Sequence, residues 1–131
     1  MNADLAAAAR DLIGTPFRLH GRDPATGLDC VGLVAEAMRR AGFHPVPPSG
    51  YGLRALSIAP LVSHARASGL VPVPRDGDVV LARVSPVQAH LLIAAPGGFV
   101  HAHAGFRRVT FLPGPLPWPV ALAWRIQPER P

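Results

Sequence analysis

The chain contains a single cysteine, Cys30, within residues 27–34 (GLDCVGLV). A lone thiol cannot form an internal disulfide, so Cys30 is either a small buried hydrophobe or a nucleophile. Asp29 is a favourable helix N-cap, which predicts that Cys30 lies in the first turn of a helix. The positive end of a helix dipole favours a thiolate over a thiol. We therefore interpret Cys30 as a nucleophile.

A cysteine nucleophile needs a base that accepts its proton and a third group that orients the base. Three of the six histidines, His90, His101 and His103, lie in two predicted strands joined by residues 95–98 (APGG), a strong hairpin signal. If these four residues form the loop, His90 faces His103 directly and His101 diagonally. We expect the three imidazoles to share one face of a sheet, whereas a loop of odd length would break this parity.

The same side chains are of types that zinc accepts, because His101 and His103 are separated by one residue and His90 and Cys30 are further candidates. However, the chain has no close Cys-x-x-Cys pair and no His-Glu-x-x-His motif. The nucleophile is therefore the stronger interpretation, and we expect no metal and no cofactor.

The elements that must position these residues are helices in the first half of the chain and strands in the second. Apolar spacing predicts helices over Asp4–Ile13, from the Asp29 cap to Gly42, and over Leu53–Ser68 with a break at Pro60. The predicted strands are Val79–Arg83, Ala89–Ala94, Phe99–Ala104, Val109–Leu112 and Val120–Ile126. Helices followed by a meander of strands indicate an α+β domain.

The composition is that of one domain over residues 1–131, since 49% of the residues are hydrophobic and can form a single core. The net charge of +5 favours an anionic partner such as an acidic wall polymer. The arginines are scattered, however, so a solvated basic surface is the simpler interpretation and we expect no direct nucleic-acid binding. No apolar run is long enough to span a membrane. The N-terminus lacks a basic signal region, so we expect synthesis in the cytoplasm without a signal peptide.

Several blocks of the sequence resemble, in the same order, the NlpC family of papain-like cell-wall peptidases. The blocks are residues 12–18 (LIGTPFR), 27–34 (GLDCVGLV), 77–81 (GDVVL), His90 at the start of a strand, and 99–102 (FVHA). The resemblance extends from about residue 8 to residue 104. It implies a papain-like α+β fold, in which N-terminal helices pack on an antiparallel β-sheet, and a peptidoglycan substrate.

By position in these blocks, the resemblance implies that Cys30 is the nucleophile, His90 the general base and His101 the residue that holds His90. Asp29 would fix the cysteine turn, and backbone N–H groups at the helix start would stabilise the oxyanion of the attacked amide. The expected triad is therefore Cys-His-His, with His103 at the rim of the substrate site.

Phe17 departs from the family pattern. The family usually has a tyrosine at this position, and its hydroxyl is thought to assist near the oxyanion. Phe17 has no hydroxyl, so another donor must substitute or the activity is reduced. His20 lies nearby in the sequence and is a candidate for that donor, although a solvated loop histidine is the simpler interpretation.

The short chain and the absence of a signal peptide resemble the phage-type branch of the family, whose members travel on phage or gene-transfer-agent tails. We predict a cysteine hydrolase that cleaves an amide bond in peptidoglycan stem peptides within such a virion or tail particle, with tail hub or tail-tip proteins as partners. The first alternative is a catalytically weak or inactive wall-binding domain of the same fold. A cysteine amidase or acyltransferase acting on another substrate is the second.

Overall fold

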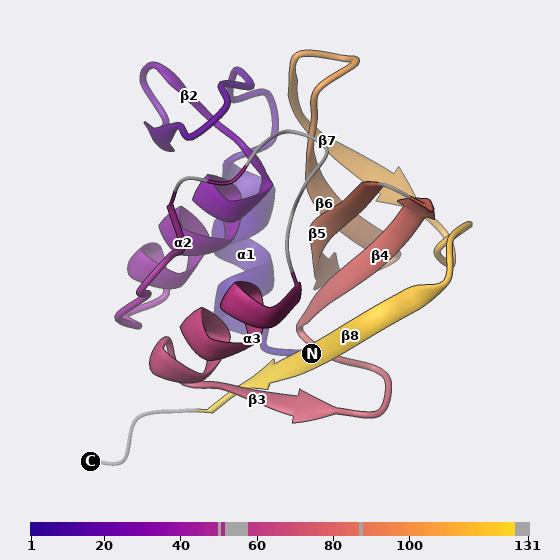
Figure 1. The fold of residues 1–131 in the computed structure, drawn as a ribbon. Coiled ribbons are helices and arrows are strands. Elements are labelled where there is room, and N and C mark those ends of the chain that lie inside the picture. The colour runs from indigo at the N-terminus through magenta and orange to yellow at the C-terminus, as the bar shows by residue number, and fades with distance from the viewer. Residues whose placement is uncertain (50, 52–57, 87, 128–131) are drawn as a thin grey trace.

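The structure is a computed structural model that describes residues 1–49, 51, 58–86 and 88–127. Three helices, α1 (Ala3–Asp11), α2 (Cys30–Arg40) and α3 (Ile58–Ala67), lie on one side of an antiparallel sheet (Figure 1). This α+β arrangement, with N-terminal helices packed on the sheet, is the predicted fold class. No helix in these described ranges is long and apolar enough to cross a membrane.

The main sheet has six strands in the order β3-β8-β4-β5-β6-β7, and every neighbouring pair is antiparallel. Its strands are β3 (Leu70–Val73), β4 (Val79–Ser85), β5 (Gln88–Ala95), β6 (Gly98–His103), β7 (Arg108–Pro113) and β8 (Val120–Ile126). A separate two-stranded hairpin, β1 (Arg22–Asp23) and β2 (Gly27–Leu28), immediately precedes α2. The hairpin and β3 were not predicted from the sequence, because strands of two to four residues are too short to show a period.

Helix α1 begins one residue earlier than predicted and ends two residues earlier. The side chain of Asn2 accepts a hydrogen bond from the backbone N–H of Leu5 and caps the start. At the end, the backbone N–H of Leu12 bonds to the Ala9 carbonyl in a tighter turn, so Ile13 lies outside the helix and is 42% exposed. The prediction that Ile13 belongs to the helix is therefore wrong.

Helix α2 has the predicted ends. Asp29 accepts a hydrogen bond from the Gly32 N–H at 2.8 Å, and Gly42 follows the helix with φ of +91°. Glu36 and Arg40 form an i,i+4 ion pair on the solvent-facing side of the helix at 2.9 Å. The local sequence therefore determines where Cys30 enters the helix.

The predicted break at Pro60 is wrong within the described residues. Helix α3 runs without interruption from Ile58, and Pro60 lies in its first turn. A proline is tolerated there because the first N–H groups of a helix have no intrahelical acceptor. The rest of the prediction, residues 53–57, lies outside the described residues.

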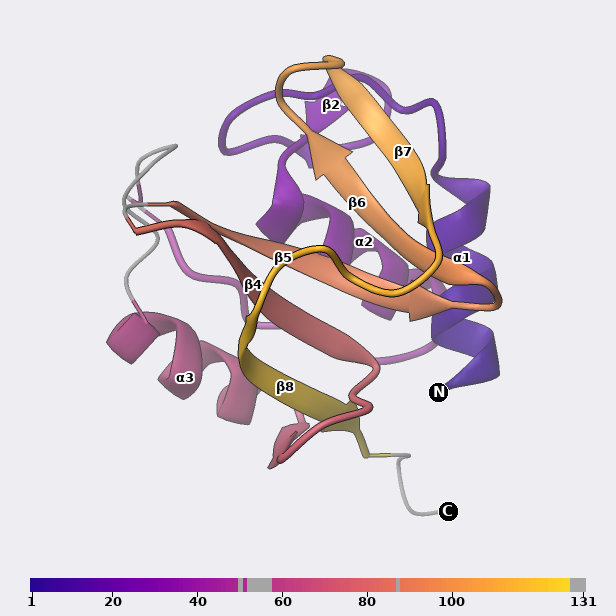
Figure 2. The ribbon, with the colours of Figure 1, turned by 90° about the vertical axis from the view of Figure 1, so that its right-hand side faces the viewer.

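Two apolar clusters cover the two faces of the sheet. The main core, between helices and sheet, includes Leu33, Leu81 and Val100. The smaller cluster is on the other face, where Leu116 and Trp118 pack over buried residues of β4, β5 and β8. Figure 2 shows the connection from β7 to β8 crossing this face. The face opposite the helices is therefore covered by a proline-rich segment.

The β5–β6 hairpin confirms the parity on which the histidine prediction depends. Ala95 pairs with Gly98, so the connection has two residues instead of four, Pro96 and Gly97, and Gly97 has φ of +82°. Proline followed by glycine suits the two central positions of a tight type II turn. Shortening the loop by two residues leaves every side chain on the face that the longer loop predicted.

Candidate active site

Cys30 is the first residue of α2, and its sulfur lies against the backbone of Leu91 in β5. The backbone N–H groups of Cys30, Val31 and Leu91 all face the sulfur and stabilise its negative form. Figure 1 shows the first turn of α2 and the start of β5 at the same end of the molecule. The helix start and the strand together therefore form a cradle of N–H donors around the thiol.

The pKa of Cys30 is raised to about 11, primarily because burial removes water from the sulfur. The three N–H donors lower this pKa, while the negative charge of neighbouring Asp29 raises it further. The expectation of a thiolate stabilised by the helix start is therefore wrong for the resting protein. Desolvation outweighs the helix dipole, and the thiol is protonated at neutral pH.

Two glycines allow the start of α2 to approach the chain that precedes it. A Cβ atom on Gly32 would lie 2.0 Å from the carbonyl oxygen of Gly21. A Cβ atom on Gly21 would lie 2.1 Å from the carbonyl oxygen of Gly27. Only residues without a side chain fit these positions, which fixes Cys30 relative to the β1–β2 hairpin.

The carboxylate of Asp29 is buried and accepts four hydrogen bonds. Its Oδ1 accepts from the Gly32 N–H at 2.8 Å and from Arg22 Nη1 at 3.1 Å. Its Oδ2 accepts from the His20 N–H at 2.8 Å and from the Tyr51 hydroxyl at 2.5 Å. Both oxygens are therefore engaged within the protein, and Asp29 holds the helix start in place.

Tyr51, like Arg22, is a member of this network that the sequence analysis missed. Its hydroxyl donates to Asp29 and accepts a hydrogen bond from Arg22 Nη2 at 2.8 Å. Burial and the Asp29 carboxylate both raise the pKa of this hydroxyl, so it remains protonated. Tyr51 is the only tyrosine of the chain, but it lies in an irregular proline-rich stretch with no pattern that links it to Cys30.

The structure places Phe17 and His20 in the segment between α1 and the β1–β2 hairpin. Phe17 packs against the main core, forms a bridge with Leu28 and donates its N–H to the Arg107 carbonyl at 2.9 Å. The His20 ring contacts the Tyr51 ring edge-on at 4.7 Å, and its Nε2 bonds to the Tyr51 carbonyl. The His20 imidazole therefore faces Tyr51.

The structure brings His90, His101 and His103 together on one face of the sheet, as predicted. The ring centroids of His90 and His101 are 6.5 Å apart, and those of His101 and His103 are 5.3 Å apart. Trp118 from the crossing segment lies 6.3 Å from the His101 ring. The neighbouring residues of these strands, Leu91 and Ala102 among them, point into the main core instead.

The thiol and the imidazoles therefore approach β5 from different sides. Cys30 meets the strand at Leu91 from the helix side, while His90, one residue earlier, pairs with Ala82 and belongs to the opposite face. Within the part of the chain that the structure describes, no hydrogen bond joins Cys30 to His90. Catalytic hydrogen bonds often form only once substrate is bound. Cys30 thus lies against Leu91, the residue that follows His90 on β5.

Burial keeps His90 and His101 neutral. The pKa of His101 is lowered to about 4 by burial and by the charges of His103 and His90. Burial and the charge of His103 also lower the pKa of His90. His101 is only 4% exposed, and among the described residues no group bonds to its Nδ1. At neutral pH, His90 is thus an uncharged base.

His103 lies at the end of β6 and is partly exposed. Its Nδ1 accepts a hydrogen bond from the Phe106 N–H at 3.1 Å, and the two rings stack with centroids 4.2 Å apart. Phe106 is 64% exposed. In the ranges that the structure describes, no group of three His, Cys, Asp or Glu side chains is arranged to hold a metal ion.

Three solved structures share this fold. NlpC1 from Trichomonas vaginalis matches with a TM-score of 0.65 and 20% identity, over 93% of this chain and 42% of that one. The NlpC/p60 domain of the peptidoglycan hydrolase SagA matches with a TM-score of 0.54 and 25% identity, over 84% of this chain and 86% of that one. An NlpC/P60 family protein from Bacillus cereus ATCC 10987 matches with a TM-score of 0.62 and 18% identity, over 93% of this chain and 38% of that one.

The chain thus spans about two fifths of the length of two of these neighbours and most of the length of the third. No protein-family model and no curated protein sequence matches it. The fold is that of NlpC/p60 domains, a papain-like α+β fold, as the sequence resemblance predicted.

Proposed function

We propose that the chain is a cysteine hydrolase that cleaves an amide bond in peptidoglycan stem peptides. The observation that carries the proposal is the position of Cys30, at the capped start of α2, within three N–H donors and against the backbone of Leu91, the residue that follows His90 on β5. The fold shared with the NlpC/p60 domain of the peptidoglycan hydrolase SagA supports this substrate class.

In this proposal, His90 accepts the thiol proton as the Cys30 sulfur attacks the amide carbonyl carbon. The carbonyl oxygen becomes an oxyanion, which accepts hydrogen bonds from the N–H groups of Cys30 and Val31. The C–N bond then breaks, the amine leaves with the proton from His90, and a thioester remains. His90 then deprotonates a water molecule, which attacks the thioester carbonyl carbon. The C–S bond breaks, the carboxylic acid is released, and His90 returns the proton to the sulfur.

His101 acts through His90 in this proposal. The two rings are 6.5 Å apart between centroids, and the His101 Nδ1 is buried without a partner among the described residues. A hydrogen bond to this buried nitrogen would hold the His90 imidazole in one orientation. We assign His101 as the residue that orients the base.

We further propose that the hydrolase works as part of a phage or gene-transfer-agent tail and acts on the periplasmic cell wall. The support is the resemblance of its sequence blocks to phage-type members of the family. Tail hub or tail-tip proteins would then be its partners. Purified tail particles that lack the chain when analysed by mass spectrometry would contradict this setting.

Digestion of purified peptidoglycan tests the hydrolase proposal. We expect the protein to release stem-peptide fragments with new amine and carboxylate ends, measured by mass spectrometry. Cys30→Ser keeps the shape of the side chain and should abolish the release, with circular dichroism as the control for folding. Sedimentation with the wall but no release would favour the wall-binding alternative, which the protonated thiol and the missing hydroxyl at Phe17 support.

A further inference from the structure

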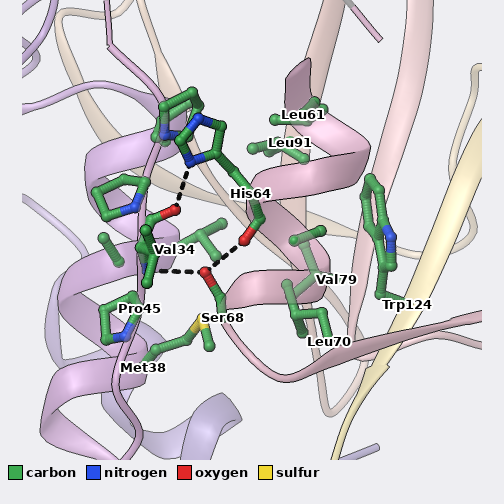
Figure 3. Close-up of a pocket in the computed structure, with 16 residues that line it drawn as sticks. Val34, Met38, Pro45, Leu61, His64, Ser68, Leu70, Val79, Leu91 and Trp124 are labelled. Carbon is green, nitrogen blue, oxygen red and sulfur yellow. Dashed lines mark hydrogen bonds between the residues drawn. The ribbon is translucent and has the colours of Figure 1, made fainter. Parts of the chain in front are cut away.

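A proline-rich strap lies against the side of α2 that carries Val34 and Met38. The strap is residues 45–48 (PVPP), and it lies over an apolar cavity of about 40 Å³ between α2, α3 and the sheet (Figure 3). The Val46 N–H donates to Ser68 Oγ at 2.8 Å, and the Val46 carbonyl accepts from His64 Nδ1 at 2.9 Å. Three prolines fix the backbone and stiffen this segment.

The other end of the strap is tied to the residue that precedes Cys30. Arg22 Nη2 donates to the Pro48 carbonyl at 3.1 Å and to the Tyr51 hydroxyl at 2.8 Å. The Tyr51 hydroxyl itself donates a hydrogen bond to Asp29 Oδ2 at 2.5 Å. The Arg22 guanidinium also lies over the Tyr51 ring, 5.6 Å from its centroid. Tyr51 thus joins the strap, Arg22 and the cap of α2.

This network acts on the charge next to the sulfur. The Asp29 carboxylate is adjacent to Cys30 and opposes formation of the thiolate. Arg22 offsets the carboxylate charge by an ion pair, and the Tyr51 hydroxyl offsets it by a hydrogen bond. The other titratable groups nearby are His20, whose N–H bonds to Asp29, and His90 on β5.

We propose that Tyr51 is a positioning residue for Cys30, because its hydroxyl holds the Asp29 carboxylate at the helix start and draws negative charge away from the sulfur. The catalytic meaning of this role rests on the proposed function. The effect on the sulfur itself does not, because thiol reactivity is measurable without any substrate.

The test is the rate of alkylation of Cys30 by iodoacetamide as a function of pH. The chain has one cysteine, so the signal is unambiguous. We expect a thiol pKa near the wild-type value of about 11 and a higher pKa in Tyr51→Phe. The variant should therefore react about threefold to tenfold more slowly at any pH below this range.

Ser68→Ala is the matched control, because it removes a hydrogen bond from the strap without touching Asp29. It should leave the pH profile unchanged even if it lowers the thermal stability. An unchanged or faster reaction of folded Tyr51→Phe overturns the proposal. If Tyr51→Phe does not fold, Arg22→Gln replaces it, with slower alkylation again expected and unchanged or faster alkylation again overturning the proposal. An inactive wild type would contradict the proposed function but would leave these alkylation results intact.

Discussion

The two sides of β5 differ in how completely their polar groups are satisfied. On the helix side, the Asp29 carboxylate accepts four hydrogen bonds and pairs with Arg22. On the other side, His101 is equally buried, but within the described residues its Nδ1 has no partner. A buried polar atom without a partner lowers stability, so it is typical of sites retained for chemistry. The helix side positions the proposed nucleophile, and the histidine side holds the proposed base in its neutral form.

The same comparison bears on proton transfer. The Cys30 pKa is raised to about 11, and the pKa of His90 is lowered. Both shifts stabilise the uncharged pair over a thiolate beside an imidazolium. In the proposed mechanism, transfer of the thiol proton to His90 would therefore accompany attack on the substrate.

The largest expected effect is the loss of hydrolytic activity when His90, on the histidine side of β5, is replaced. His90→Gln removes the proposed base, so we expect hydrolysis of peptidoglycan to fall about 10³-fold. The melting temperature should hardly change, because His90 makes no contribution comparable to the Asp29 network. His103→Gln is the matched control and should cost much less activity, measured as kcat/KM. Equal losses in the two variants would contradict the assignment of His90.

The next largest effect is the loss of stability when Asp29, on the helix side of β5, is replaced. Asp29→Ala leaves Arg22 without its ion-pair partner and removes the cap of α2. We expect the free energy of unfolding, measured by urea denaturation, to fall by about 3–5 kcal/mol. Asp29→Asn keeps the cap and loses only the charge, so its loss should be smaller. A neutral outcome for Asp29→Ala would show that the network has no structural role.

A pH effect of similar or smaller size should come from His101. The unfolded imidazole binds a proton near its ordinary pKa of 6.5, whereas the folded one does so only near 4. The unfolded state therefore binds more protons between these values, and stability is lost as the pH falls from 6.5 toward 4, by roughly 3 kcal/mol at most. Urea unfolding at several pH values measures this slope. His101→Leu should make stability less dependent on pH in this range. An unchanged slope would show that a group other than His101 takes up the protons on unfolding.

Local signals explain what could be predicted of the fold and the site. Asp29 followed by an amphipathic run determined the start of α2, because capping and helical period depend on neighbours in the sequence. The APGG turn determined the face of the three histidines, because side chains alternate along a strand whatever its partners.

The contact of Tyr51 with Asp29 and the pKa of the Cys30 thiol could not be predicted, because both depend on segments that meet only in the folded chain. Tyr51 reaches Asp29 from 22 residues away, through an irregular stretch. The Cys30 pKa depends on burial beside Leu91, 61 residues further along the chain. A helix start alone predicts a lower thiol pKa, and only packing shows that desolvation reverses the sign.

The smallest expected effect is a change in kcat when a hydroxyl is added at Phe17, on the helix side of β5. Phe17 bridges to Leu28, two residues before Cys30, while the Tyr51 hydroxyl already donates its hydrogen bond to Asp29. Phe17→Tyr supplies a donor at the position where the resembling family has one. We expect kcat to rise by up to about tenfold, with KM nearly unchanged, since an oxyanion donor acts mainly in the transition state.

Phe17→Leu is the control for packing, and it should lower stability without raising kcat. If Phe17→Tyr leaves kcat unchanged, the N–H groups of Cys30 and Val31 are sufficient for the oxyanion. The helix side would then be complete as it stands, and the rate would be limited by the approach of His90 from the other face.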